Sequence, residues 1–226
     1  MIVFDIETLP CNDQETILEL QKEIKAPGQF KKPESIAVWM KENKEAELEK
    51  IVSKTSFDGM YGRVACIAWA FDDGEILSTN DYMSEAEAIT LFYDSIENSS
   101  IREYLFCGHN IAGFDLPFLK HRSIILGIRP PNKLLEAMNA KPWDICIADT
   151  MLMWSADKHK QGSMDRLCKA FGIYGKGDFD GSMVAETWLT DPQKVIDYCK
   201  DDVHRTREMY KKLTFSTQLK LSKSAA

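Results

Sequence analysis

Short apolar runs separated by polar and turn residues predict five strands in this chain. The turn sequence Asp72, Asp73, Gly74 between the second and third runs predicts that these two strands form an antiparallel hairpin. The five predicted strands cover residues 2–6, 64–71, 75–79, 104–107 and 145–148.

Apolar residues recur at helical spacing in most of the remaining chain. Ser84 and Glu87 have the spacing of a capping box, which marks the start of a helix. Two more helices are predicted over residues 114–126 and 192–213. This order of elements predicts an α/β fold with a mixed sheet flanked by helices. The apolar side of the capped helix is predicted to carry Ala88, Leu91, Phe92 and Ile96.

Residues 11–61 separate the first strand from the second and are too long for a simple connection. The segment is rich in Lys and Glu, and we interpret it as a helical insertion, a candidate flap over a functional site. Its positive and negative charges are mixed, so they do not by themselves indicate that the segment binds nucleic acid. Its apolar residues at helical spacing are Ile36, Val38, Trp39 and Met40, then Leu48, Ile51 and Val52.

The composition is that of an ordinary globular protein of 226 residues, with 44% hydrophobic and 28% charged residues. One domain is expected over residues 1–213, followed by a flexible polar tail over residues 214–226. There is no apolar run of membrane-spanning length and no signal-peptide pattern, so neither export nor membrane binding is expected. Six scattered cysteines without a C-x-x-C pair favour reduced thiols in a cytoplasmic protein over disulfides or a zinc site.

The formal net charge of −7 argues against binding of nucleic acid through bulk electrostatic attraction. It does not exclude an enzyme that handles phosphates through metal ions, because bound cations place positive charge where a phosphodiester would lie. The functional argument therefore depends on candidate metal ligands.

Asp5 and Glu7 lie two residues apart in the first strand, so their side chains project from the same face. Ile2, Phe4 and Ile6 would then face a core. A divalent cation between the two carboxylates would remove their repulsion, and hard oxygen ligands suit magnesium or manganese. The alternative is a solvated polar face on a half-exposed strand.

A second polar segment follows the fourth strand and contains Asn110, Phe114 and Asp115. Asp115 is expected at the start of a helix, where it could be a metal ligand or could simply stabilise the helix dipole. Phe114, if exposed, offers a ring on which a base could stack.

Tyr198 and Asp202 are four residues apart in the last predicted helix and therefore share a face. Asp201 points about a quarter-turn away, toward Asp197 and Arg205. The alternative interpretation is a surface tyrosine beside an acid. The pair flanks an apolar stripe that is predicted to face the sheet and consists of Val195, Ile196, Cys199 and Val203.

Together these motifs resemble those of the DEDD 3′→5′ exonucleases of the ribonuclease H-like superfamily, in the subclass with tyrosine in the last motif. The motifs are Asp-Ile-Glu-Thr at residues 5–8, Asn110 with Phe114 and Asp115, and Tyr198 with Asp202. Within that group the chain is most similar to the proofreading domain of family B DNA polymerases and its stand-alone bacterial or phage relatives. The similarity runs through residues 2–213, is weakest in the insertion, and implies a ribonuclease H-like fold.

The resemblance implies that Asp5, Glu7, Asp115 and Asp202 bind two divalent metal ions, Mg²⁺ or Mn²⁺. One ion would be held by Asp5, Glu7 and Asp202, and the other chiefly by Asp5 and Asp115. Tyr198 would orient the attacking water by hydrogen bonding, because a tyrosine with an ordinary pKa of about 10 is a poor general base at neutral pH.

The resemblance also implies contacts with the terminal nucleotide from Thr8, Leu9, Asn110 and Phe114. Thr8 could instead be a turn residue, Leu9 a core residue and Asn110 a hydrogen-bonding loop residue. Asp149 precedes a predicted helix and is interpreted as its N-cap, and the following Met151, Met153 and Trp154 are interpreted as core.

Three remaining residues are not assigned to the site. The histidine subclass would place its histidine in the last motif, so His109 is set aside, and His204 should face away from Asp202. Lys176 lies in a polar glycine-containing loop, which is weak evidence for phosphate binding.

The implied activity is metal-dependent 3′→5′ hydrolysis of single-stranded nucleic acid, DNA in the first instance, with release of nucleoside 5′-monophosphates. An exoribonuclease of the same mechanism and a non-catalytic nucleic-acid-binding module remain open alternatives. The implied partner is a single-stranded 3′ end. A separate polymerase or repair protein is a further partner that the sequence leaves open.

Overall fold

The computed structural model describes residues 1–101, 104–155, 162–175 and 177–216. Its sheet has the order β3-β2-β1-β4-β5, in which β1 is antiparallel to β2 and parallel to β4. The predicted α/β class and mixed five-stranded sheet are confirmed. The strands are β1 (Ile2–Leu9), β2 (Arg63–Phe71), β3 (Ile76–Ser78), β4 (Phe106–Gly108) and β5 (Ile147–Asp149).

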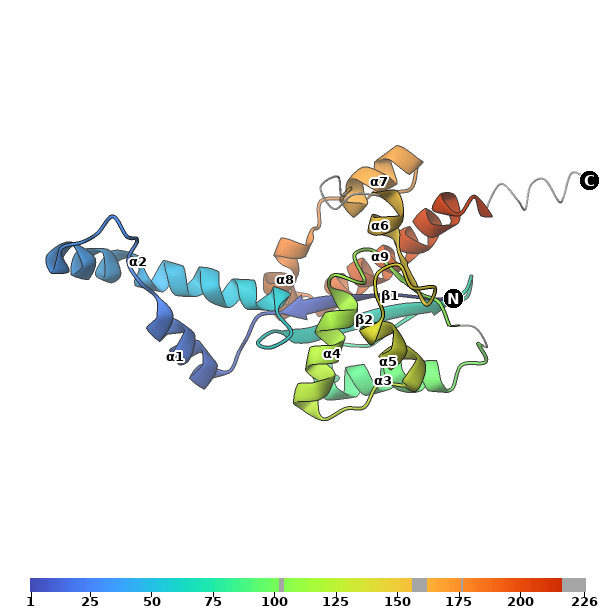
Figure 1. Ribbon diagram of the computed structural model, residues 1–226, viewed down its shortest axis with the longest axis horizontal. Helices are drawn as coiled ribbons and strands as arrows, with labels where there is room; N and C mark the ends of the chain where they lie inside the picture. Colours follow the sequence, from blue (N-terminus) through green and yellow to red (C-terminus); the bar gives the residue numbers. More distant parts are fainter. Residues whose placement is uncertain (102–103, 156–161, 176, 217–226) are drawn as a thin grey trace, which may run out of the picture.

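Two groups of helices cover the two faces of this sheet (Figure 1). One face packs against α3 (Glu85–Glu97), α4 (Asp115–Leu126) and α5 (Asn132–Asn139). The other face packs against α8 (Val184–Thr190) and α9 (Pro192–Leu213), and α9 is also contacted by the short helices α6 (Thr150–Trp154) and α7 (Met164–Phe171). Each side of β1 therefore has its own hydrophobic core.

The capping box of α3 is confirmed, because the Ser84 hydroxyl accepts from the Glu87 amide and the Glu87 carboxylate accepts from the Ser84 amide. Ala88, Phe92 and Ile96 are buried as predicted, but Leu91 is 38% exposed. Ile89 and Tyr93 are also buried, so the buried face of the helix is rotated away from Leu91.

Two helices lie between β1 and β2, α1 (Gln14–Glu23) and α2 (Pro33–Lys54), followed by the 3₁₀ turn η1 (Thr55–Phe57). Figure 1 shows α1 and α2 extending away from the sheet as an arm. Neither helix has a buried residue, so the apolar positions predicted from helical spacing do not form a core face. The helical insertion is thus present, whereas its role as a flap stays a prediction.

The boundaries of the other elements agree closely with the sequence pattern. The last helix covers the predicted residues, and β1 continues three residues beyond its predicted end to Leu9. Ile145 is 97% exposed, because β5 begins only at Ile147. Met153 and Trp154 are 41% and 49% exposed, so their assignment to the core was wrong.

No helix among the described residues combines the length and apolar character needed to cross a bilayer. The six cysteines form no disulfide in the described part of the chain, and five of them are buried. The predicted tail continues past Leu213, and its residues 217–226 lie outside the described residues.

Candidate functional site

Strand β1 presents Asp5 and Glu7 on the face that packs against α8 and α9. Ile2, Phe4 and Ile6 point to the opposite face and belong to the core under α3 and α4. Asp5 and Glu7 are partly exposed. The alternation predicted from the sequence is therefore present, with the two carboxylates directed toward the last helix.

Helix α9 brings Asp202 to this pair. One carboxylate oxygen from each of Asp5, Glu7 and Asp202 lies within 4.8 Å of the other two. Three negative groups at this separation repel, and a divalent cation bound by all three would replace repulsion with attraction. Carboxylate oxygens are also the ligands that magnesium and manganese prefer, so the residues present fit such an ion.

Arg205 supplies positive charge to this cluster. Its guanidinium is ion-paired with Asp202 and donates to the Gly175 carbonyl at 3.3 Å. A third contact reaches the largely exposed Asp201 carboxylate at 3.4 Å. Helical spacing predicted that Arg205 lies on the side of Asp201, and its side chain is 3% exposed. Arg205 and Asp202 are three residues apart in the helix, which also allows a contact. A buried guanidinium needs a buried charged partner, and Asp202 is buried whereas Asp201 is exposed.

Asp115, the first residue of α4, contacts strand β1. Strand β4 pairs with β1 only at Ile2 and Val3, which leaves the backbone of the following β1 residues without a strand on that side. The Asp115 carboxylate accepts a hydrogen bond from the Ile6 amide there, at 3.2 Å. Asp115 is thereby attached to the residue that lies between Asp5 and Glu7.

The Asp115 carboxyl is 3% exposed, and this burial raises its pKa to about 7. Backbone hydrogen bonds, including the one from Ile6, oppose the rise, while the charges of Asp149 and Asp202 add to it. A buried carboxyl with a raised pKa gains strongly from a nearby cation, because the cation favours its ionised form.

Tyr198 lies on the same side of α9 as Asp202 and is 6% exposed. Burial raises the pKa of its phenol far above the ordinary value, and the carboxylates of Asp202, Glu7 and Asp5 raise it further. Its ring packs edge-on against Phe179, with the ring centroids 4.9 Å apart. A neutral phenol held in this way is a hydrogen-bond donor and not a base.

Cys199 contacts Asp5 of the cluster, and this contact was not predicted from the sequence. Its thiol lies 3.4 Å from the Asp5 carbonyl oxygen and 3.6 Å from the Asp5 carboxylate. The residue is predicted and found in the apolar stripe of α9. The contact with Asp5 depends on how α9 crosses the sheet, so helical spacing alone does not predict it.

Asp149 is a fifth carboxylate near the site, and it is 2% exposed. It is the N-cap of α6, as predicted, accepting from the Met151 and Leu152 amides. It also accepts from the Asn110 and Ala112 amides, both at 3.1 Å. Because Asn110 has a φ of +66°, a region that most residues avoid, these contacts hold a strained loop directly before Asp115.

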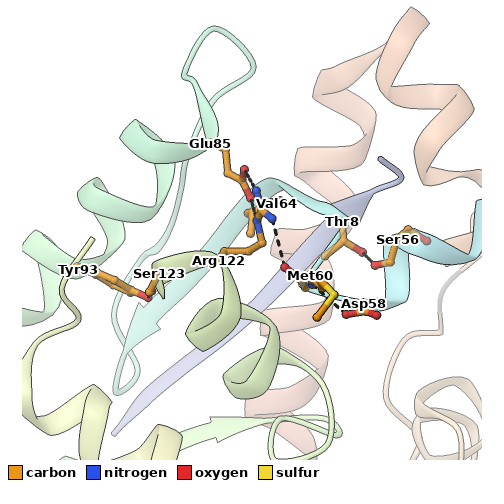
Figure 2. Close-up of polar contacts among 10 residues, drawn as sticks. Thr8, Ser56, Asp58, Met60, Val64, Glu85, Tyr93, Arg122 and Ser123 are labelled. Carbon is orange, nitrogen blue, oxygen red and sulfur yellow. Dashed lines mark hydrogen bonds and ion pairs between the residues drawn. The ribbon is translucent and has the colours of Figure 1, made fainter. Parts of the chain in front are cut away.

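The four residues predicted to contact substrate differ in their exposure and contacts. The Thr8 hydroxyl donates to the Ser56 carbonyl at 2.7 Å (Figure 2). Leu9 is 5% exposed, so a base could reach only a small part of it. Asn110 and Phe114 are both partly exposed. The Phe114 ring has Phe118 as a neighbour, at a centroid distance of 5.5 Å.

The residues set aside from the sequence remain outside the cluster. A ring nitrogen of His109 lies 3.0 Å from the Thr150 hydroxyl. His204 is exposed on α9. Lys176 lies outside the described residues.

A solved structure supports the same fold. The family B DNA polymerase from the hyperthermophilic archaeon Pyrobaculum calidifontis matches with a TM-score of 0.58 and 19% sequence identity. The match covers 94% of this chain and 24% of the polymerase chain, so this protein spans about a quarter of that polymerase. At this identity the match shows the ribonuclease H-like fold that the sequence motifs predict. A comparison with curated proteins found no significant match.

A family model matches residues 60–225, which include Asp115, Tyr198 and Asp202. The arm and the strand that carries Asp5 and Glu7 precede the matched region. The family is described as "Predicted 3'-5' exonuclease related to the exonuclease domain of PolB". Since the match extends over most of the sequence, the chain belongs to this family of predicted 3′-5′ exonucleases related to the PolB exonuclease domain.

Proposed function

We propose that this protein is a metal-dependent 3′→5′ exonuclease that removes nucleoside 5′-monophosphates from single-stranded DNA. The observation that carries the proposal is the convergence of Asp5, Glu7 and Asp202 oxygens within 4.8 Å. These residues come from the two ends of the chain, and a compact anionic cluster would obstruct an anionic substrate unless cations were bound. Membership of a predicted exonuclease family supports the same conclusion.

Asp5, Glu7 and Asp202 would hold one divalent ion, and Asp5 with Asp115 a second. Such ions, when bound, lower the pKa of water and neutralise the leaving oxygen of a phosphodiester. The attachment of Asp115 to the Ile6 amide supports its inclusion, because this contact directs Asp115 toward the strand that carries Asp5. Magnesium and manganese remain equal candidates, since both accept oxygen ligands.

Tyr198 would donate a hydrogen bond to the attacking water. Its raised pKa supports this assignment, because a phenol that stays protonated cannot remove a proton at neutral pH. The protein would thus have the tyrosine form of the last motif. Asp115, once ionised, would add a further negative ligand.

The terminal nucleotide would lie beside Phe114 and Asn110. The partial exposure of both residues supports this position, and Asp149 holds the loop that carries Asn110. Thr8 uses its hydroxyl hydrogen for Ser56, so its remaining contributions to a nucleotide are acceptor contacts and its backbone. DNA is proposed because the matching polymerase is a DNA polymerase.

Digestion of matched DNA and RNA single strands labelled at the 5′ end tests the proposal. With Mg²⁺ or Mn²⁺, a 3′→5′ exonuclease shortens labelled DNA one nucleotide at a time and releases 5′-monophosphates, whereas EDTA stops the reaction. Faster digestion of the RNA would identify an exoribonuclease of the same mechanism. Intact strands that remain bound would identify a binding module and contradict the proposal.

A further inference from the structure

Phe57 is a solvent-exposed aromatic residue beside the candidate site. It ends η1 at the base of the arm, and 72% of its surface is exposed. Its ring centroid lies 6.5 Å from that of Phe114, with the ring planes inclined by 59°. Exposure of a large ring costs free energy in water, and here the ring sits next to the loop that leads into Asp115. Phe57 lies in the insertion and has no place in the motifs recognised from the sequence.

The backbone around Phe57 is attached to the end of β1. Thr8 donates to the carbonyl of Ser56, the residue before Phe57, at 2.7 Å. The Thr55 hydroxyl accepts from the Cys11 amide at 2.8 Å, and Thr55 is 6% exposed. Because Thr8 directly follows Glu7, these bonds fix Phe57 close to the end of the strand that carries the carboxylates.

The chain after Phe57 is attached to α4. Arg122 donates to the Gly59 carbonyl at 3.2 Å, and its guanidinium forms a two-point ion pair with Glu85 at 2.8 and 2.9 Å. Figure 2 shows Arg122 with Glu85 on one side of this turn and Thr8 with Ser56 on the other. The ion pair is largely buried, and Glu85 also accepts from the Val64 amide at 2.8 Å. Its strength is therefore little weakened by solvent.

Close packing restricts the same turn further. A Cβ atom on Gly59 would lie 2.9 Å from the Cβ of His121 and 3.0 Å from the carbonyl oxygen of Phe118. The turn therefore rests directly on α4, the helix whose first residue is Asp115. An exposed ring on a backbone fixed at both sides is organised before any ligand arrives, so less ordering entropy is lost on binding.

We infer that Phe57 and Phe114 form a stacking platform for two consecutive bases at the 3′ end of a single strand. The inference rests on the proposed function and assigns part of the substrate site to the arm. Both rings are linked to the candidate metal ligands through neighbouring residues. Phe57 follows Ser56, which is bonded to Thr8 next to Glu7, and Phe114 directly precedes Asp115. Stacking on aromatic faces tolerates any base, which suits an enzyme that removes nucleotides regardless of sequence.

Steady-state hydrolysis of a 5′-labelled DNA strand tests the platform. Phe57→Ala is expected to raise KM about tenfold with little change in kcat, because stacking binds the strand away from the reacting phosphate. Phe57→Trp should restore the KM, whereas Phe57→Leu, which is apolar but lacks a π face, should not. Phe215→Ala removes a comparably exposed phenylalanine, 64% exposed, beyond the end of α9, and should leave KM unchanged.

DNA strands that lack one base test which nucleotide stacks on Phe57. An abasic position next to the 3′-terminal nucleotide should raise the KM of the wild-type protein and remove the difference between wild type and Phe57→Ala. A Phe57→Ala protein with wild-type KM on intact DNA, or a Leu variant as good as the Trp variant, would overturn the platform alone. A wild-type protein that hydrolyses neither DNA nor RNA would overturn the proposed function, and the platform with it.

Discussion

At the scale of single residues, the site contains carboxyl groups that are buried away from water, which makes their ionised form costly. Asp115 is the clearest case, because burial raises the pKa of its carboxyl to about 7 although backbone hydrogen bonds, including the one from Ile6, oppose the rise. Arg205 provides positive charge next to Asp202. In the absence of a divalent ion, the stability of the protein should therefore depend on the protonation of Asp115.

Unfolding measured in EDTA at several pH values should show this dependence. The pKa of Asp115 is about 7 in the folded protein and 3.8 as the reference for the unfolded chain, so the folded state holds an extra proton between these values. The free energy of unfolding should consequently decrease as pH rises from about 4 to about 7. Asp115→Asn should lose this part of the pH dependence.

The exposed Asp81 offers a matched control. Asp81→Asn should keep the pH dependence of the wild type. Parallel curves for wild type and Asp115→Asn would show that the Asp115 carboxyl titrates in the folded protein as it does in the unfolded chain, against this account.

At the scale of elements, the parallel pairing of β4 with β5 assembles the second part of the site. It places Gly108 opposite Asp149, and Asp149 then joins the end of β5 to the loop at Asn110 and to the start of α6. In the described part of the chain, the hydrogen bonds that this carboxylate accepts come from backbone N–H groups. Both of its oxygens therefore act as acceptors.

Asp149→Asn should lower the free energy of unfolding by about 1–3 kcal/mol, because its amide NH₂ would face a backbone donor. The matched control is Asp13→Asn at the exposed N-cap of α1, where asparagine caps as well as aspartate. Chemical denaturation measures both changes, and kcat/KM should fall only in the Asp149 variant. Equal stability of the two variants would show that the contacts to the loop contribute little.

The sequence predicted where these helices and strands lie better than it predicted the contacts between them. Hydrophobic spacing placed the last helix correctly and separated Asp202 from Asp201, because helix faces are a local property. The contacts of Asp149 with Asn110 depend on strand pairing across many intervening residues, so the N-cap was predicted and the loop contacts were not. Arg205 could reach either acid by spacing alone, and only the packing of α9 decided that it is buried.

At the scale of the whole molecule, the carboxylate cluster is assembled from opposite ends of the chain. Strand β1 contributes Asp5 and Glu7, and α9 lies across it to contribute Asp202. At this crossing the Cys199 thiol lies next to the Asp5 carbonyl, although the two residues are 194 positions apart in the sequence. The net charge of −7 does not exclude a nucleic-acid substrate, because cations bound at these acids would place positive charge where a phosphodiester would lie.

The most direct test of this account compares Asp202→Ala with Asp201→Ala in the digestion of 5′-labelled single-stranded DNA with Mn²⁺. Both acids contact Arg205, but only Asp202 belongs to the cluster. Asp202→Ala should lower kcat on the order of a hundredfold or more, because a ligand of the proposed ion is lost. Asp201→Ala should remain close to wild type, since the Asp201 carboxylate is largely exposed and Arg205 keeps its ion pair with Asp202. Equal activity of the two variants would contradict the account.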